Sequence, residues 1–144
     1  MNLPAPIPGL VVSYSYLWRN EALRGVEEGR KDRPCVVILT VDGSDGEWVV
    51  TVAPITHSPP TRADEAIVLP LRTKARLGLD DQPSWIMAKD LNQFTWPGVD
   101  LRPVQRGANR CDYGVIPTRL LFQVKDRVLA MIRAGRVGIT RRSE

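Results

Sequence analysis

The only histidine in the chain, His57, directly follows an apolar segment and stands between the hydroxyl side chains of Thr56 and Ser58. A proline pair comes next, so the segment ends at a rigid stretch of backbone. A second junction of this kind lies upstream, where a charged run ends at Arg33 and Pro34 opens another apolar segment. A guanidinium, a hydroxyl and an imidazole at two predicted strand ends suit chemistry on a phosphate.

The proline after Arg33 restricts the geometry of this arginine. A residue before proline is held in extended backbone conformation, so the junction keeps the guanidinium at the lip of the predicted sheet. Arginine also forks onto phosphate through two hydrogen bonds, whereas lysine acts as a point charge. Taken alone, the same residues fit simpler roles, because Arg33 can cap a strand or pair with Asp32, and His57 can be a polar surface residue.

Several common chemistries have no motif in the chain. It contains no Walker-type phosphate loop, no GxGxxG, no HExxH and no GxSxG. Its two cysteines, Cys35 and Cys111, have no CxxC partners, so with one histidine we expect no metal site, no disulfide framework and no cofactor. A single histidine also excludes a ribonuclease mechanism that needs two.

Length and charge limit the class of protein further. A chain of 144 residues supports one domain, residues 1–144, with an ordinary core. No apolar run approaches the roughly 18 residues of a membrane helix, and the N-terminus lacks the basic region of a secretory signal, so we expect a cytoplasmic protein with no membrane contact. Residues 101–144 carry 10 Lys and Arg against 3 Asp and Glu, which fits a polyanionic partner or a solvated basic surface.

Short alternating segments predict strands, and one periodic segment predicts a helix near the C-terminus. The fold class is therefore mainly β with a C-terminal helix, arranged as a strongly bent sheet or small barrel. The predicted helix, residues 117–134, presents an apolar face made of Leu120, Leu121, Val124, Val128, Leu129 and Ile132. We expect strands at residues 10–18, 35–41, 47–55, 66–71, 85–88 and 92–96, helical character at 72–77, a barrel core over 9–116, a long mobile loop at 19–32 and a frayed basic tail at 135–144.

In this order and spacing, the motifs resemble the MazF/PemK family of toxins from type II toxin-antitoxin systems. The resemblance spans roughly residues 9–134. Its residues are Gly9 before a strand, Arg33-Pro34 opening an apolar strand, Pro54-Ile55-Thr56 ending a strand, Ser84-Trp85-Ile86-Met87-Ala88 continuing to Trp96, and the helix at 117–134.

The resemblance implies a small SH3-like barrel of the MazF-like (CcdB/PemK) kind that forms a homodimer and is paired with a cognate antitoxin protein. It also implies cleavage of single-stranded RNA, such as mRNA, without metal: the ribose 2′-hydroxyl attacks the adjacent phosphorus and leaves a 2′,3′-cyclic phosphate. Arg33 would be the principal catalytic residue, Thr56 would position the phosphate, and His57 would add acid or base catalysis.

The chain also departs from the family pattern. Many relatives have Gly-x-Arg-Pro, whereas two extra residues separate Gly29 from Arg33 here. Many carry Asp-Gln where this chain has Lys89-Asp90, and a basic residue is frequent where Asn92 stands. We therefore expect a different readout of RNA bases. Candidate RNA-contacting residues are Arg30, Lys31, Ser58, Lys89, Asn92 and Gln93.

Rival interpretations use the same barrel. One is a non-catalytic module that binds nucleic acid or protein, such as an inactive relative or a CcdB-like topoisomerase poison. The C-terminus argues against the poison, because residues 138–144 contain no tryptophan. A purely structural barrel is the third alternative.

Overall fold

The apolar run at residues 35–38 becomes part of a long strand in the computed structural model, which describes residues 1–26, 31–43 and 46–142. This strand, β2 (Asp32–Asp42), pairs antiparallel with β3 (Trp48–Thr56), and Cys35 lies opposite Pro54. The two strands form the hairpin that the sequence predicts. Because Cys35, Val36, Val37 and Ile38 are all buried, the strand reads as a continuous apolar run instead of an alternating one.

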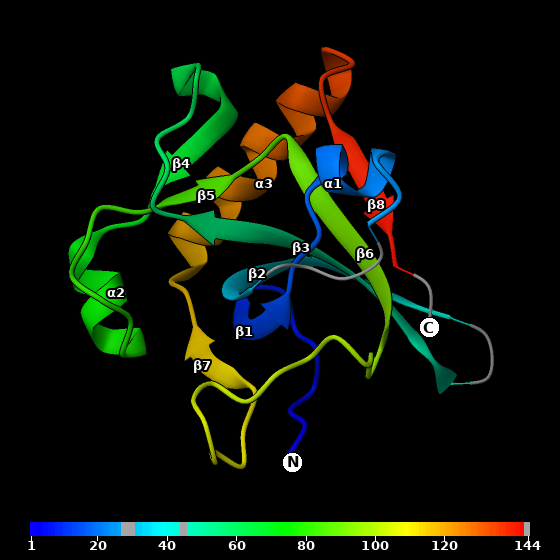
Figure 1. The fold of residues 1–144 in the computed structure, drawn as a ribbon. Coiled ribbons are helices and arrows are strands. Elements are labelled where there is room, and N and C mark those ends of the chain that lie inside the picture. Colours follow the sequence, from blue (N-terminus) through cyan, green and yellow to red (C-terminus); the bar gives the residue numbers. More distant parts are fainter. Residues whose placement is uncertain (27–30, 44–45, 143–144) are drawn as a thin grey trace.

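One eight-stranded sheet dominates the fold, and it is mainly antiparallel (Figure 1). The mainly β class with a C-terminal helix is thereby confirmed. None of the helices in the described residues has the length and apolar character needed to cross a bilayer. The other elements are β1 (Leu10–Ser15), α1 (Arg19–Leu23), η2 (Ala63–Glu65), β4 (Ala66–Val68), α2 (Leu71–Leu77), β5 (Trp85–Met87), β6 (Asp90–Trp96), β7 (Asp112–Val115), α3 (Thr118–Arg133) and β8 (Gly138–Arg141).

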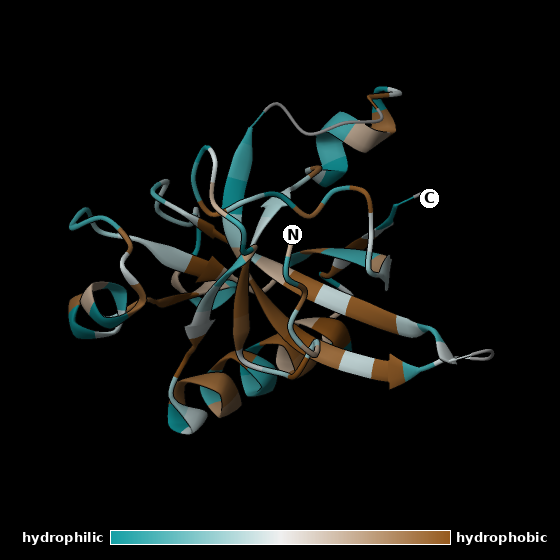
Figure 2. Cartoon of the chain, turned by 90° about the horizontal axis from the view of Figure 1, so that it is seen from below, coloured by the Kyte–Doolittle hydropathy of each residue, from teal (hydrophilic) through white to brown (hydrophobic). Residues whose placement is uncertain are grey.

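The sheet is covered on both faces, which gives the protein two apolar clusters. Val36 and Ile38 face a cluster that α3 closes with Leu120, Val124 and Val128. Cys35 and Val37 face the opposite way, into a cluster with aromatic rings of β1 and β6. In this cluster the Tyr14 and Phe94 rings stack, with their centroids 4.7 Å apart. In Figure 2, residues coloured as hydrophobic follow the strands of the sheet and parts of the long helix. The β2–β3 hairpin is therefore packed on both of its faces.

The helix α3 confirms the predicted C-terminal helix but buries a narrower face than expected. Leu120, Val124, Val128 and Met131 are buried and follow one stripe of the helix. Leu129 and Ile132 were expected on the buried face, yet they are 44% and 50% exposed. Each follows a buried residue by one position, which rotates its side chain about 100° away from the sheet.

Pro54 occupies a place in β3 where the strand tolerates a residue without a backbone N–H. On the side away from β2, β3 pairs with β6 up to Val52 and with β5 from Ile55 onward. Pro54 therefore lies where the strand changes partner, and β3 continues in regular geometry to Thr56. The irregular backbone that the nearby prolines suggest begins only after Thr56.

Residues 16–32 differ from the prediction. The first strand ends at Ser15 instead of continuing to Trp18, and the expected long loop contains the short helix α1. The cause is a side chain distant in sequence: Asn92 Oδ1 accepts a hydrogen bond from the Leu17 N–H, and Asn92 Nδ2 donates to the Leu17 carbonyl. These two bonds replace a strand partner and turn the chain toward α1.

The frayed tail was also a wrong prediction. Residues 138–141 form β8, which pairs parallel with β6, and Arg142 is buried after it. Arg142 Nη1 donates to the Ser15 carbonyl, and its Nη2 lies 3.1 Å from Asp100 Oδ1. The predicted strand at 66–71 is shorter, because Leu71 begins α2, and β7 was not predicted at all.

Candidate active site

The ends of β2 and β3 bring Arg33 and Thr56 to one place. Arg33 lies two residues before Cys35, and Thr56 lies two residues after Pro54, which is the partner of Cys35. Both residues are therefore at the same end of the hairpin and on the same face of the sheet. They line a cleft of about 350 Å³.

The Arg33 side chain is held against an aromatic ring. Its Cζ lies 5.0 Å from the centroid of the Trp18 ring, an arrangement that favours the cation and limits its movement. Its Nε is buried and has no hydrogen-bond partner among the described residues. A buried donor without an acceptor is costly. A hydrogen bond from Nε to an anionic oxygen would remove this cost.

Thr56 supplies a fixed hydroxyl beside this arginine. The residue is 7% exposed, and its Oγ1 accepts a hydrogen bond of 3.1 Å from the Ser58 N–H. Because the oxygen acts as acceptor in that bond, its hydrogen remains for donation. The pairing of Thr56 with Trp85 in β5 fixes the backbone that carries it.

His57 enters the same cleft as part of a chain of polar contacts. Its Nε2 lies 2.7 Å from Asp80 Oδ2, and the Nζ of Lys74, from α2, lies 2.5 Å from Asp80 Oδ1. Lys74 is 1% exposed and also donates to Ser84 Oγ at 2.6 Å and to the Gln82 carbonyl. The imidazole is thus attached to a carboxylate that a buried cation holds.

The same contacts keep Asp80 ionised. The hydrogen bond from Lys74 lowers the pKa of the Asp80 carboxyl, and the Gln82 N–H and the His57 ring lower it further against the opposing effect of burial. An ionised Asp80 accepts hydrogen bonds only, so the 2.7 Å contact places a hydrogen on His57 Nε2. The free nitrogen of a neutral ring is then Nδ1.

Among the predicted RNA-contacting residues, two are found at the cleft. Lys31 and Ser58 line it and are exposed. Arg30 lies outside the described residues. Gln93 lies away from the cleft, and its Nε2 is 3.3 Å from Thr51 Oγ1 on β3.

The prediction for Asn92 was wrong. The residue is fully buried, and both ends of its amide are engaged with the Leu17 backbone at 2.7 and 3.0 Å. Its Oδ1 also accepts from Arg142 Nη1 at 3.1 Å. Asn92 therefore shapes the fold behind Trp18 and does not reach the surface.

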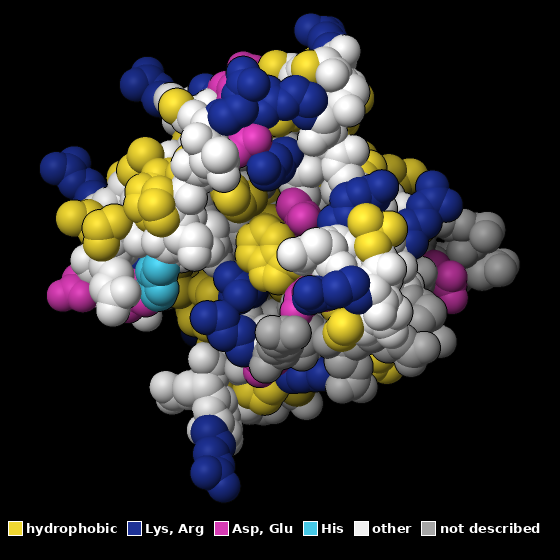
Figure 3. All heavy atoms as spheres, turned by 45° about the horizontal axis from the view of Figure 1, so that its top comes forward, with side chains coloured by type: hydrophobic (Ala, Val, Ile, Leu, Met, Phe, Trp, Pro, Cys, Tyr) yellow, Lys and Arg dark blue, Asp and Glu magenta, His cyan; other side chains and the backbone are white. Residues whose placement is uncertain are grey.

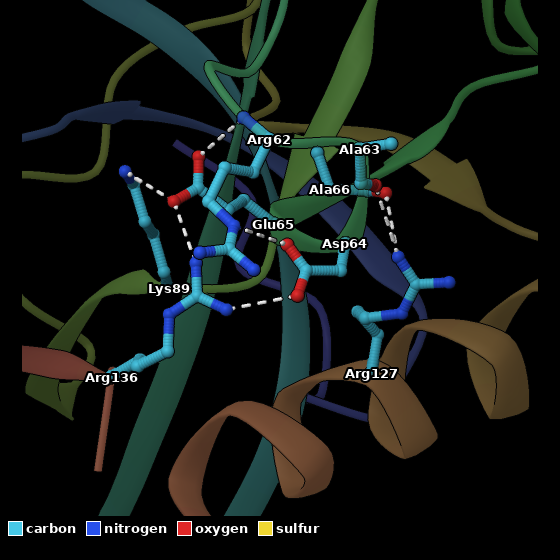
Figure 4. A network of polar contacts seen from close by, with 8 residues as sticks. All are labelled: Arg62, Ala63, Asp64, Glu65, Ala66, Lys89, Arg127 and Arg136. Atoms are coloured by element: carbon cyan, nitrogen blue, oxygen red, sulfur yellow. Dashed lines mark hydrogen bonds and ion pairs between the residues drawn. The ribbon is translucent and has the colours of Figure 1, made fainter. Parts of the chain in front are cut away.

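Lys89 belongs to a separate ion-pair network (Figure 4). Its Nζ lies 2.9 Å from Glu65 Oε2, which Arg136 Nη2 approaches at 3.0 Å. Arg136 also reaches Asp64, at 2.9 Å. The hydrogen bond from Lys89 lowers the pKa of Glu65, and Arg136 contributes to the same shift. Lys89 therefore connects parts of the fold and does not line the cleft around Arg33.

Sequence reasoning missed Trp18, Lys74 and Asp80, which also line the cleft. Trp18 read as the last residue of a strand. Lys74 and Asp80 read as ordinary charged residues in and after a short helix, and no local pattern distinguishes them from surface residues. Ser84 also lines the cleft, and its motif, Ser84-Trp85-Ile86-Met87-Ala88, was the one sequence signal for this side of the site.

The assembled site offers hydrogen-bond donors to an anion and one imidazole that can accept or donate a proton. Figure 3 shows Lys and Arg side chains beside the single imidazole on this face of the molecule. No group of three or more His, Cys, Asp or Glu side chains in the described ranges is arranged to hold a metal ion. The geometry suits stabilisation of charge on a phosphorane.

Comparison with known proteins gives one match. The family model of the PemK-like, MazF-like toxin of type II toxin-antitoxin systems matches residues 20–107, which include Arg33, Thr56, His57 and Asp80. No curated protein and no solved structure matches the chain.

Proposed function

Because this chain belongs to the family of PemK-like, MazF-like toxins of type II toxin-antitoxin systems, we propose that it is an endoribonuclease that cleaves single-stranded RNA without a metal ion. The observation that carries the proposal is the meeting of Arg33 and Thr56 in one cleft, where a buried donor of Arg33 lacks a partner among the described residues. A cytoplasmic mRNA is the proposed substrate.

The reaction is an internal transfer at phosphorus. The ribose 2′-oxygen forms a bond to the adjacent phosphorus, and the bond from phosphorus to the 5′-oxygen of the next nucleotide breaks. One proton leaves the 2′-hydroxyl and one arrives at the departing 5′-oxygen, so the products are a 2′,3′-cyclic phosphate and a 5′-hydroxyl. The nonbridging oxygens gather negative charge, which Arg33 and Thr56 meet with fixed donors.

The chemistry is tested directly by the products and by metal removal. We expect cleavage of a single-stranded RNA to continue in excess EDTA and to yield 2′,3′-cyclic phosphate ends, because guanidinium, hydroxyl and imidazole supply the needed donors and proton exchange. Mass spectrometry of the fragments identifies the ends. A strict Mg²⁺ requirement or 3′-hydroxyl products would refute the mechanism, and RNA binding without any cleavage would favour the non-catalytic module.

We also propose that the chain forms a homodimer. The outer face of α3 exposes Phe122, Leu129 and Ile132, which are 58%, 44% and 50% exposed. Burial of such side chains against a second copy is favourable. Sedimentation at micromolar concentration is expected to report about twice the 16.1 kDa mass of one chain. A monomer that cleaves RNA at full rate contradicts this proposal.

Membership of a type II toxin family implies a cognate antitoxin protein. We propose that the antitoxin is encoded beside this gene as a short acidic chain, since the exposed Lys31 and the guanidinium of Arg33 line the cleft. Copurification of the neighbouring gene product tests this partner. If no such reading frame adjoins the gene, the proposal of a cognate antitoxin fails.

A further inference from the structure

Lys74 is a buried cation whose position requires an explanation. Its side chain is 1% exposed, and burying an ammonium group is costly unless its hydrogens find acceptors. Three acceptors surround Nζ: Asp80 Oδ1, Ser84 Oγ and the Gln82 carbonyl. An ammonium has three hydrogens, so this set uses all of them. Lys74 therefore has no hydrogen left for RNA, and what it holds is Asp80.

Asp80 in turn is held from two sides. Oδ1 accepts from Lys74 at 2.5 Å and from the Gln82 N–H at 3.1 Å, while Oδ2 lies 2.7 Å from His57 Nε2. One carboxylate oxygen is anchored to the protein and the other is presented to the imidazole. Such an arrangement fixes both the orientation of a histidine ring and the nitrogen that carries its hydrogen.

We propose that Asp80 and Lys74 are positioning residues that hold His57 with its hydrogen on Nε2, so that Nδ1 is the nitrogen that exchanges the proton during RNA cleavage. The assignment to cleavage rests on the proposed function, whereas the positioning itself does not. In the reaction, neutral Nδ1 accepts the proton of the 2′-hydroxyl, and the resulting imidazolium returns a proton to the 5′-oxygen. His57 therefore takes up one proton and releases one proton in each reaction.

The charges around His57 predict opposite effects for the two positioning residues. Asp80 stabilises the imidazolium, whereas Lys74 offsets part of the Asp80 charge. The other charged residues that line the cleft are Lys31, just before β2, and Asp32 and Arg33 at the start of β2, and all three are unchanged in both variants. Asp80→Asn is therefore expected to move the titration midpoint of His57 to lower pH, and Lys74→Met to move it to higher pH.

The single histidine makes this experiment simple, because one imidazole Cε1–H resonance is followed by proton NMR from pH 5 to 9 without assignment. Asp81→Asn is the matched control: it removes the same charge one residue away, on an exposed side chain. We expect a shift for Asp80→Asn that clearly exceeds the shift for Asp81→Asn. Equal midpoints for wild type and Asp80→Asn would overturn the proposal. Asp80 is 47% exposed, so this variant is expected to fold even if Lys74→Met does not.

Cleavage assays separate this proposal from the proposed function. The acid limb of the pH-rate profile is expected to follow the NMR midpoint in each variant, and Asp80→Asn is expected to slow single-turnover cleavage about tenfold or more. A displaced midpoint in a protein that never cleaves RNA retains the positioning and refutes the endoribonuclease. Cleavage with a profile that does not move in Asp80→Asn refutes the role of Asp80 and leaves the endoribonuclease intact.

Discussion

Replacing Arg33 with lysine is expected to slow RNA cleavage about a hundredfold or more while changing RNA affinity little. The substitution keeps one positive charge at the end of β2, so attraction to the phosphate backbone persists. It removes the planar fork, which can donate two parallel hydrogen bonds to the oxygens of a phosphorane. The loss therefore falls on the transition state.

The environment of Arg33 explains why lysine cannot replace it. The Cζ of its guanidinium lies over the Trp18 ring, 5.0 Å from the ring centroid. Its buried Nε has no hydrogen-bond partner within the described part of the chain. A flexible ammonium would neither stack in this way nor supply a donor at the Nε position. Arg33→Ala is expected to reduce cleavage further than Arg33→Lys.

The measurement combines single-turnover cleavage with equilibrium binding to a 2′-deoxy substrate that cannot be cleaved. Arg133→Lys, at the exposed end of α3, is the matched control and is expected to cleave like wild type. If Arg33→Lys weakens binding and leaves the single-turnover rate unchanged, Arg33 is one phosphate contact among several. Equal rates for wild type and Arg33→Ala would remove Arg33 from the site.

The parts of this site that sequence could predict are those with a strong local signal. Arg33 and Thr56 lie where an apolar run meets a proline or a polar turn, and such boundaries locate strand ends to within a few residues. The hairpin register then places the two residues together without further information. The helix α3 was predictable for a related reason, since its apolar spacing persists over several turns.

The parts that sequence could not predict depend on contacts between distant segments. Asn92 turns the chain at Leu17, which lies 75 residues earlier in the sequence. The residue types at 16–18 give no local signal that the strand ends there. Residues 138–141 form a strand because the edge of β6 is available to them. His57 meets Asp80, 23 residues later in the sequence, only because the fold brings the end of β3 beside the segment after α2. Each of these features is a tertiary effect on a short segment with weak propensity.

Removal of the Thr56 hydroxyl is expected to slow RNA cleavage about as much as Arg33→Lys does. Thr56→Val keeps the volume and the branched shape that suit a strand, so β3 is expected to retain its pairing with β5. We expect single-turnover cleavage to fall about a hundredfold, because one fixed donor to the developing charge is missing. Thr56→Ser keeps the hydroxyl and is expected to remain within about tenfold of wild type, a smaller loss than removal of the donor causes.

A second threonine on the same strand provides the control for Thr56. Thr51 is 5% exposed, similarly buried, but it contacts Gln93 and lies outside the cleft. Thr51→Val therefore makes the same chemical change in β3 without removing a donor from the site, and we expect it to cleave at the wild-type rate. If both valine variants slow cleavage equally, the loss reflects the strand and not the hydroxyl. If only Thr56→Val is slow and Thr56→Ser is active, the donor at the end of β3 acts on the transition state, because the chemical change and the burial are matched between the two valine variants.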